Sequence, residues 1–69
     1  MARFAASALV PLDRVLWQRI DVDAEGPRRA VVAGTRHRRP ATVRVDLDTA
    51  FVLVEAGVPT VTRRVGSHA

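Results

Sequence analysis

The sequence contains no cysteine, and this absence excludes two common ways of stabilising a small protein. A chain without cysteine forms neither disulfides nor thiolate zinc sites. The chain has only 69 residues, and a domain of this size buries only about 60% of the surface that its unfolded chain exposes. Small domains usually draw extra stability from disulfides, a metal or another subunit. We therefore expect a single small domain over residues 1–69 that forms a homo-oligomer or binds a protein partner.

Lysine is absent as well, so all eleven basic residues are arginine, and the net charge is +4. A positive charge of this kind is typical of proteins that bind nucleic acids. The lack of lysine, together with many alanines and valines, is equally typical of a GC-rich coding sequence, which makes arginine the default basic residue. The composition therefore leaves nucleic-acid binding possible without establishing it.

Long hydrophobic runs are also missing, because no stretch approaches the roughly 18 apolar residues of a membrane-spanning helix. Residues 1–11 carry one arginine and a short apolar run, but Pro11 ends that run before it reaches the length found in a signal peptide. We expect a cytoplasmic protein without a membrane segment. Residues 1–12 would form a short N-terminal helix or arm, and residues 66–69 a polar tail.

The patterns on which catalysis and cofactor binding depend are not found. The chain has no nucleophile–base–acid set, no glycine-rich phosphate loop and no metal-ligand spacing. Residues 21–26 copy the start of an EF-hand, but calcium also needs a carboxylate at position 12 of that loop, where this chain has Val32. We predict a polar hairpin turn there, in a protein that is not an enzyme and uses no cofactor, metal or small-molecule substrate.

The clearest pattern that is present lies in residues 42–65. Apolar and polar residues alternate from residue 42 to 48, which gives a strand one apolar and one charged face. The apolar run 51–54 continues this strand after a bend or forms its hairpin partner. A turn at residues 56–59 then leads into a last strand at residues 60–65.

The first half of the chain is more ambiguous. Residues 15–22 alternate as a strand, with Leu16 and Ile20 on one face and Val15 and Trp17 on the other. A second strand over residues 28–33 would pair with it, followed by a loop at residues 34–40. These elements predict a mostly β fold, a small five-stranded barrel or meander. Because residues 12–20 and 49–57 could each be strand or helix, an α+β fold is the alternative.

Arginine side chains are the candidate contact residues, because guanidinium groups bind phosphates and also pair with the carboxylates of acidic proteins. The candidates are Arg28, Arg29, Arg36, His37, Arg38 and Arg39, and the first two would join the loop from the adjacent strand. Trp17 and two phenylalanines are the only aromatic residues. We expect them in the core, which argues against stacking on nucleic-acid bases.

Two further patterns match known motifs only in part. Asp46 and Asp48 share a strand face, but no histidine or lysine supports them, so we expect a solvated face paired with Arg44 or Arg63. Residues 53–65 resemble the turn of a helix-turn-helix in LacI-type repressors, where a recognition helix opens with a Thr-Val-Ser/Thr-Arg pattern. That family has two more residues in the turn, and their loss would rotate the helix by about 200°. We therefore expect a hairpin.

These observations predict a non-catalytic binding module that acts as an oligomer or as an accessory component of a larger assembly. The alternative is a small basic regulator that contacts the phosphates of DNA or RNA through the arginine loop at residues 36–39. Both hypotheses rest on the small size of the chain and on its arginines.

Overall fold

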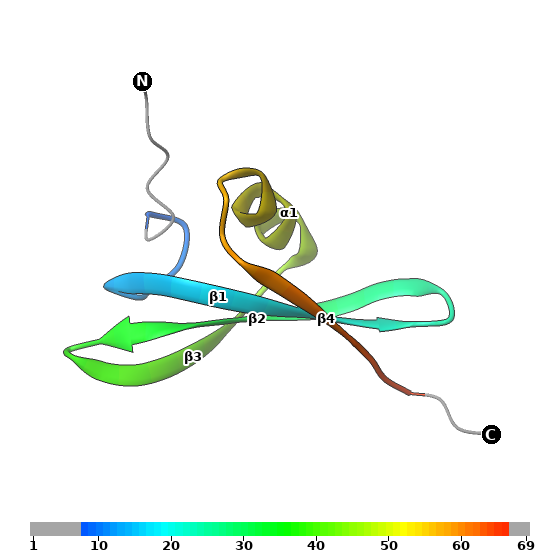
Figure 1. Ribbon diagram of the computed structural model, residues 1–69, viewed down its shortest axis with the longest axis horizontal. Helices are drawn as coiled ribbons and strands as arrows, with labels where there is room; N and C mark the ends of the chain where they lie inside the picture. Colours follow the sequence, from blue (N-terminus) through cyan, green and yellow to red (C-terminus); the bar gives the residue numbers. More distant parts are fainter. Residues whose placement is uncertain (1–7, 67–69) are drawn as a thin grey trace.

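The computed structural model describes residues 8–66, which form one open four-stranded sheet with a single helix packed on one face (Figure 1). The strands are β1 (Arg14–Asp23), β2 (Gly26–Arg36), β3 (Arg39–Val45) and β4 (Thr60–Arg64), and the helix is α1 (Leu47–Glu55). Their order across the sheet is β3-β2-β1-β4. The first three strands are antiparallel neighbours, whereas β4 lies parallel to β1. The chain therefore crosses from one edge of the sheet to the other through α1.

The prediction of a mostly β fold is confirmed, but the sheet stays open and a five-stranded barrel does not form. Two elements differ from the prediction. The segment expected as a strand after residue 48 is the helix α1, and most of the loop expected at residues 34–40 belongs to β2 and β3. Residues 1–7 and 67–69 of the expected arm and tail lie outside the described region. Within that region, no helix has the length and apolar character needed to cross a membrane.

Caps at both ends explain why the valine-rich segment before Ala56 is helical. The carboxylate of Asp46 accepts a hydrogen bond from the Thr49 backbone N–H at 2.7 Å, which also lowers the pKa of Asp46. At the other end, Gly57 has a φ of 94°, and the N–H of Val58 donates to the Leu53 carbonyl at 3.0 Å. This is a Schellman motif. The turn predicted at residues 56–59 is therefore confirmed, but it ends a helix.

These elements correct two motif interpretations. Asp48 lies in the first turn of α1, so the carboxylates expected on one strand face instead lie at a helix N-terminus, where negative charge is favourable. The residues that would open a recognition helix form β4, which pairs with Gln18–Val22 of β1. No helix-turn-helix is present within residues 8–66, because α1 is followed by a strand.

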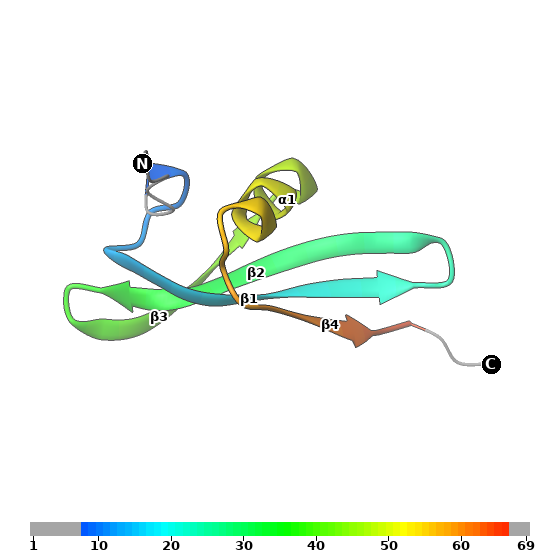
Figure 2. The same cartoon turned by 45° about the horizontal axis from the view of Figure 1, so that its top comes forward.

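The core lies between the sheet and a second layer made of α1 and the segment before β1 (Figure 2). Its fully or nearly fully buried apolar residues are Val10, Leu12, Ile20, Ala30, Val32, Ala50 and Leu53. Gln18 is buried in the same layer and donates to the Ala50 carbonyl at 2.9 Å and to the Thr60 hydroxyl at 3.0 Å. One side chain of β1 therefore links the helix to β4.

A β-bulge decides which residues of β1 face this core. The pairing of β1 with β2 skips Leu16. Because of the extra residue, Val15 packs against the core on the same face as Gln18, while Leu16 and Trp17 lie together on the opposite face. The predicted alternation, with Val15 and Trp17 on one face, is wrong because a bulge shifts every residue before it.

A close backbone contact requires glycine at position 34. A Cβ atom at Gly34 would lie 1.8 Å from the carbonyl oxygen of Arg14 and 3.2 Å from a side-chain carbon of Leu12. The chain lies this close because it folds over β2 just before β1 begins, where the Asp13 N–H donates to the Thr35 carbonyl at 2.8 Å. Because Gly34 has no side chain, the chain can lie close enough to β2 for Leu12 to reach the core.

Replacing Gly34 by alanine should lower the free energy of unfolding by about 3 kcal/mol, because the new methyl group meets backbone that has little freedom to move. Gly57→Ala is the matched control, since a Cβ there meets nothing within 4 Å and only its positive φ is unfavourable, at about 1 kcal/mol. Urea denaturation should show the larger loss for G34A. Equal losses in the two variants would contradict the contact with Arg14.

Candidate functional site

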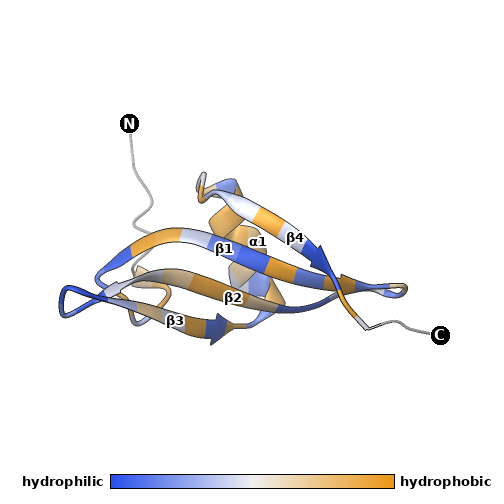
Figure 3. Cartoon of the chain, turned by 60° about the horizontal axis from the view of Figure 1, so that its bottom comes forward, coloured by the Kyte–Doolittle hydropathy of each residue, from blue (hydrophilic) through white to orange (hydrophobic). Residues whose placement is uncertain are grey.

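The face of the sheet opposite α1, which we call the open face, is covered by no element within residues 8–66 (Figure 3). Strand pairing arranges its residues in rows that run across the sheet. The hairpin row holds Arg14, Thr35 and Pro40; the tryptophan row Trp17, Ala33 and Thr42; the middle row Val61, Arg19, Val31 and Arg44; and the aspartate row Arg63, Asp21 and Arg29. Residues two apart on a strand, as in successive rows, are separated by roughly 7 Å.

Asp21 is the centre of the aspartate row, and arginines bury its carboxylate until the side chain is only 3% exposed. Its Oδ1 accepts a hydrogen bond from Arg19 Nε at 2.9 Å, and its Oδ2 accepts one from Arg63 Nη2 at 3.2 Å. Arg29 Nε lies 3.9 Å from the same Oδ2. The cluster joins β2, β1 and β4. One carboxylate facing three guanidinium groups leaves two positive charges in excess.

Charge is divided between the two sides of the protein. The register places five arginines on the open face, namely Arg14, Arg19, Arg29, Arg44 and Arg63. Asp21 lies among them, and Asp23 at the end of β1 shares the face by alternation. On the other side, Asp46, Asp48 and Glu55 belong to α1 or its cap. Within residues 8–66, the ion pairs found include neither Arg14 nor Arg44. The helix side also holds Arg36, Arg39 and Arg64 by alternation, so its charges balance, and the open face is the more positive side.

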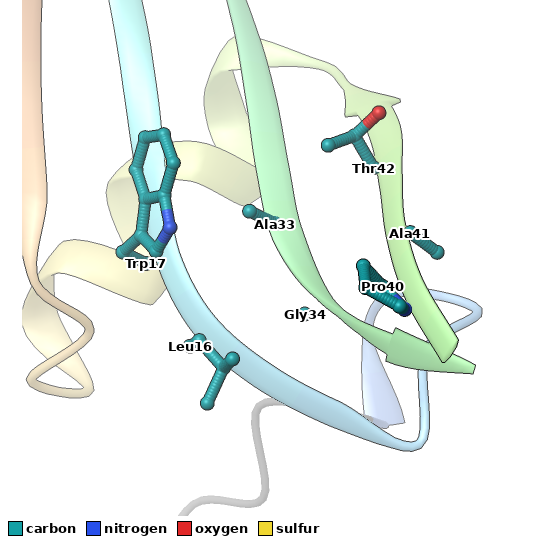
Figure 4. A pocket seen from close by; sticks show the side chains of 7 residues that line it. All are labelled: Leu16, Trp17, Ala33, Gly34, Pro40, Ala41 and Thr42. Carbon is teal, nitrogen blue, oxygen red and sulfur yellow. The ribbon is translucent and has the colours of Figure 1, made fainter. Parts of the chain in front are cut away.

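Trp17 also belongs to the open face, where 43% of its surface is exposed. The prediction that it lies in the core is wrong, because Gln18 and Ile20 face the core and Trp17 alternates with them. A groove of about 420 Å³ lies beside the indole, between β1 and β3 (Figure 4). An exposed aromatic ring beside a groove gives this positive face an apolar contact site as well.

The predicted arginine loop is the tip of the β2–β3 hairpin, and it has only two residues. His37 and Arg38 have φ values of 52° and 66°, as at the central positions of a type I′ turn. These conformations cost roughly 1–2 kcal/mol for each non-glycine residue, and Asp13 supports the turn by accepting the His37 N–H at 2.7 Å. Arg36 pairs with Arg39, and alternation from the hairpin row places both on the helix side.

The other predicted contact residues, Arg28 and Arg29, do not join this tip. Arg36 follows Arg29 by seven positions along β2, a length of roughly 23 Å. Arg28 pairs with Asp23 and, at 2.8 Å, with Glu25. The Glu25 backbone N–H and then Arg28 lower the pKa of Asp23. The six predicted residues therefore divide among the hairpin tip, the β1–β2 turn and the aspartate row.

The β1–β2 turn also confirms the polar turn expected at residues 21–26. Asp23 accepts the Glu25 N–H at 2.7 Å, which closes the turn locally. In the part of the chain that the structure describes, no three histidine, aspartate or glutamate residues gather in a way that could hold a metal ion.

Sequence reasoning missed the residues that dominate the open face, Trp17, Arg19, Arg44 and Arg63. The alternation of Arg44 with Val43 and Val45 was a usable signal, since it already places this arginine on the face away from the core. The alignment of Arg63 with Asp21 depends on a parallel pairing between distant segments, so no local pattern indicates it.

Comparison with known proteins adds no relative from which a function could be transferred. No family model matches the chain, and the searches found no similar curated protein and no similar solved structure.

Asp21→Asn should lower the free energy of unfolding by about 2 kcal/mol, the usual contribution of hydrogen bonds to a charged group, because three arginines would lose their shared anion. Asp23→Asn is the control, since it removes the same charge from an ion pair in the solvent-exposed β1–β2 turn. Urea denaturation should show a clearly smaller loss for D23N. If both variants lose the same stability, the aspartate row does not hold the strands together.

Proposed function

We propose that this protein is a non-catalytic binding module whose open face binds the phosphate backbone of a nucleic acid. The observation that carries the proposal is the aspartate row, in which one buried carboxylate orients three arginines. Guanidinium groups donate in a planar fork that matches phosphate oxygens. Because Asp21 already orients these side chains, less conformational entropy is lost when a phosphate binds them.

The distribution of the remaining charges supports the same ligand. Arg44 extends the positive surface to the β3 edge, and Arg14 extends it toward the hairpin tip. The acidic residues of α1 and its cap lie on the opposite side of the sheet. The helix side also carries Arg36, Arg39 and Arg64, which balance those acidic residues, so a polyanion is attracted more strongly to the open face. Such contacts read the backbone and give little sequence preference.

Arg44→Ala should weaken nucleic-acid binding about five- to tenfold at 0.1 M salt, the effect of losing one phosphate contact. The slope of log K against log salt concentration should become shallower by just under one unit. Fluorescence anisotropy of a labelled oligonucleotide, titrated at several salt concentrations, measures both quantities.

The matched control for this experiment is Arg28→Ala. It changes the net charge by the same amount, but Arg28 is engaged by Asp23 and Glu25 in the β1–β2 turn. We expect R28A to retain nearly the affinity of the unmodified protein. Equal weakening by R28A and R44A would contradict a phosphate contact on the open face, and no salt-dependent binding at all would overturn the proposed function.

A protein partner is a second candidate, because the outer side of α1 exposes three large apolar residues. Phe51, Val52 and Val54 are 45%, 44% and 44% exposed. They share the exposed side of α1 with Asp48 and Glu55, and exposed apolar residues that gather in one place mark a site of protein contact. This side of the protein is separate from the open face, so a protein contact here is compatible with nucleic-acid binding there. A protein contact through α1 would make the protein an oligomer or an accessory component of a larger assembly.

If α1 mediates self-association, sedimentation equilibrium should show a dimer or larger species for the unmodified protein. Phe51→Glu should shift the protein to the monomer, because it places a charge at the centre of the apolar contact, and Phe51 is exposed enough for the fold to remain intact. Asp48→Ala, which removes a charge on the same exposed side, serves as the control and should leave the oligomer unchanged. A monomeric unmodified protein at high concentration would exclude self-association through α1.

A further inference from the structure

The groove on the open face exists because the residues of β2 at this point are very small, whereas those of the neighbouring strands β1 and β3 are larger. Ala33 and Gly34 form its floor, the indole of Trp17 stands on the β1 side, and Pro40 and Thr42 stand on the β3 side (Figure 4). The groove is open to solvent along the sheet surface, and its volume is about 420 Å³. Its shape is that of a shallow slot with one aromatic wall.

The position of Trp17 is unfavourable for a protein with so thin a core. A tryptophan side chain supplies more apolar surface than any other residue, and cores normally use it. Here it is 43% exposed, and the bulge adds Leu16 to the same face, so two large apolar side chains lie in water at this end of β1. An exposed tryptophan beside a preformed groove is the arrangement that proteins use to stack on planar rings.

We propose that this groove holds a base of a single-stranded nucleic acid, stacked on the indole of Trp17, while arginines of the neighbouring rows hold the phosphates on either side. This inference rests on the proposed function and specifies its ligand. Arg14 of the hairpin row lies on one side of the tryptophan row, and Arg19 and Arg44 of the middle row lie on the other. In a single strand of nucleic acid, each planar base is flanked by two anionic phosphates, and this spacing matches a tryptophan between two rows of arginines.

Charge and shape select this occupant over the alternatives. The residues that line the groove include no acidic side chain, and its polar side-chain atoms are those of Trp17 and Thr42. A second copy of the protein is disfavoured, because two open faces would bring five arginines against five. A duplex is disfavoured because its bases are stacked inside the helix and present no free ring face. With so few polar groups, the groove should accept different bases with similar affinity.

The intrinsic fluorescence of the protein tests this placement directly, because Trp17 is its only tryptophan. Titration with an oligothymidine should quench the fluorescence in step with binding. Heparin, an anion without bases, should bind the arginines with little quenching, and a DNA duplex of the same length should behave as heparin does. An acidic peptide is included as a further arm and should bind more weakly than the oligothymidine.

Two variants test the groove by different means. Trp17→Leu removes the ring face and should weaken oligothymidine binding roughly tenfold, the effect of losing one stacked base. Ala33→Leu fills the floor while it keeps the indole and every charge, and it should weaken binding by a similar factor and abolish quenching. Ala24→Leu adds the same side chain at an exposed turn position far from the groove and should have no effect. Circular dichroism and thermal unfolding confirm that each variant is folded.

The possible outcomes separate this inference from the proposed function. Weaker single-strand binding in W17L and A33L, with duplex affinity and salt slope unchanged, supports the groove as a base site. If both folded variants bind oligothymidine as tightly as A24L, or if heparin quenches equally well, the inference fails while phosphate binding stands. Tighter binding of the acidic peptide overturns it in favour of a protein ligand. If no nucleic acid binds, both proposals fail together.

Discussion

Four strands present two faces, and one helix of nine residues covers only one of them. The strands must therefore be held together on a face that remains in water. On the open face, the carboxylate of Asp21 links β1 to β2 through Arg29 and to β4 through Arg63. On the covered face, Gln18 links β1 to α1 and to Thr60 of β4. Both residues belong to β1, so this strand organises the sheet from both of its sides.

The open face is not built for stability alone. A single arginine would neutralise Asp21, and apolar residues are often as stabilising as a buried ion pair. The protein instead places three arginines around this carboxylate and leaves Trp17 exposed two rows away. Excess charge and an uncovered aromatic ring both reduce the stability of a small domain. Their occurrence together on one face supports the proposal that a nucleic acid binds there.

Strong local patterns predicted much of the fold. The alternation of apolar and polar residues predicted β1 and a strand over most of β3. Turn-forming residues predicted the β1–β2 turn and the turn at Gly57. The helix α1 was predicted only as an alternative to a strand, because its valine-rich composition favours strands, while the caps at Asp46 and Gly57 that make it helical depend on bonds to backbone groups. The open face was missed because it depends on the bulge at Leu16 and on the parallel register of β4. Neither is encoded in any short stretch of sequence.

The position of β4 has a consequence for how the chain folds. Asp21 and Arg63 are 42 residues apart, and contacts between distant segments form late because closing a long loop costs entropy. Until β4 docks, one edge of β1 has unpaired backbone groups beside the apolar side chains of Leu16 and Trp17. Such an edge is a template for pairing with the same edge of another chain. Because β1 itself carries two arginines and two aspartates, its charge does not oppose such pairing, and the docking of β4 is the step that removes this edge.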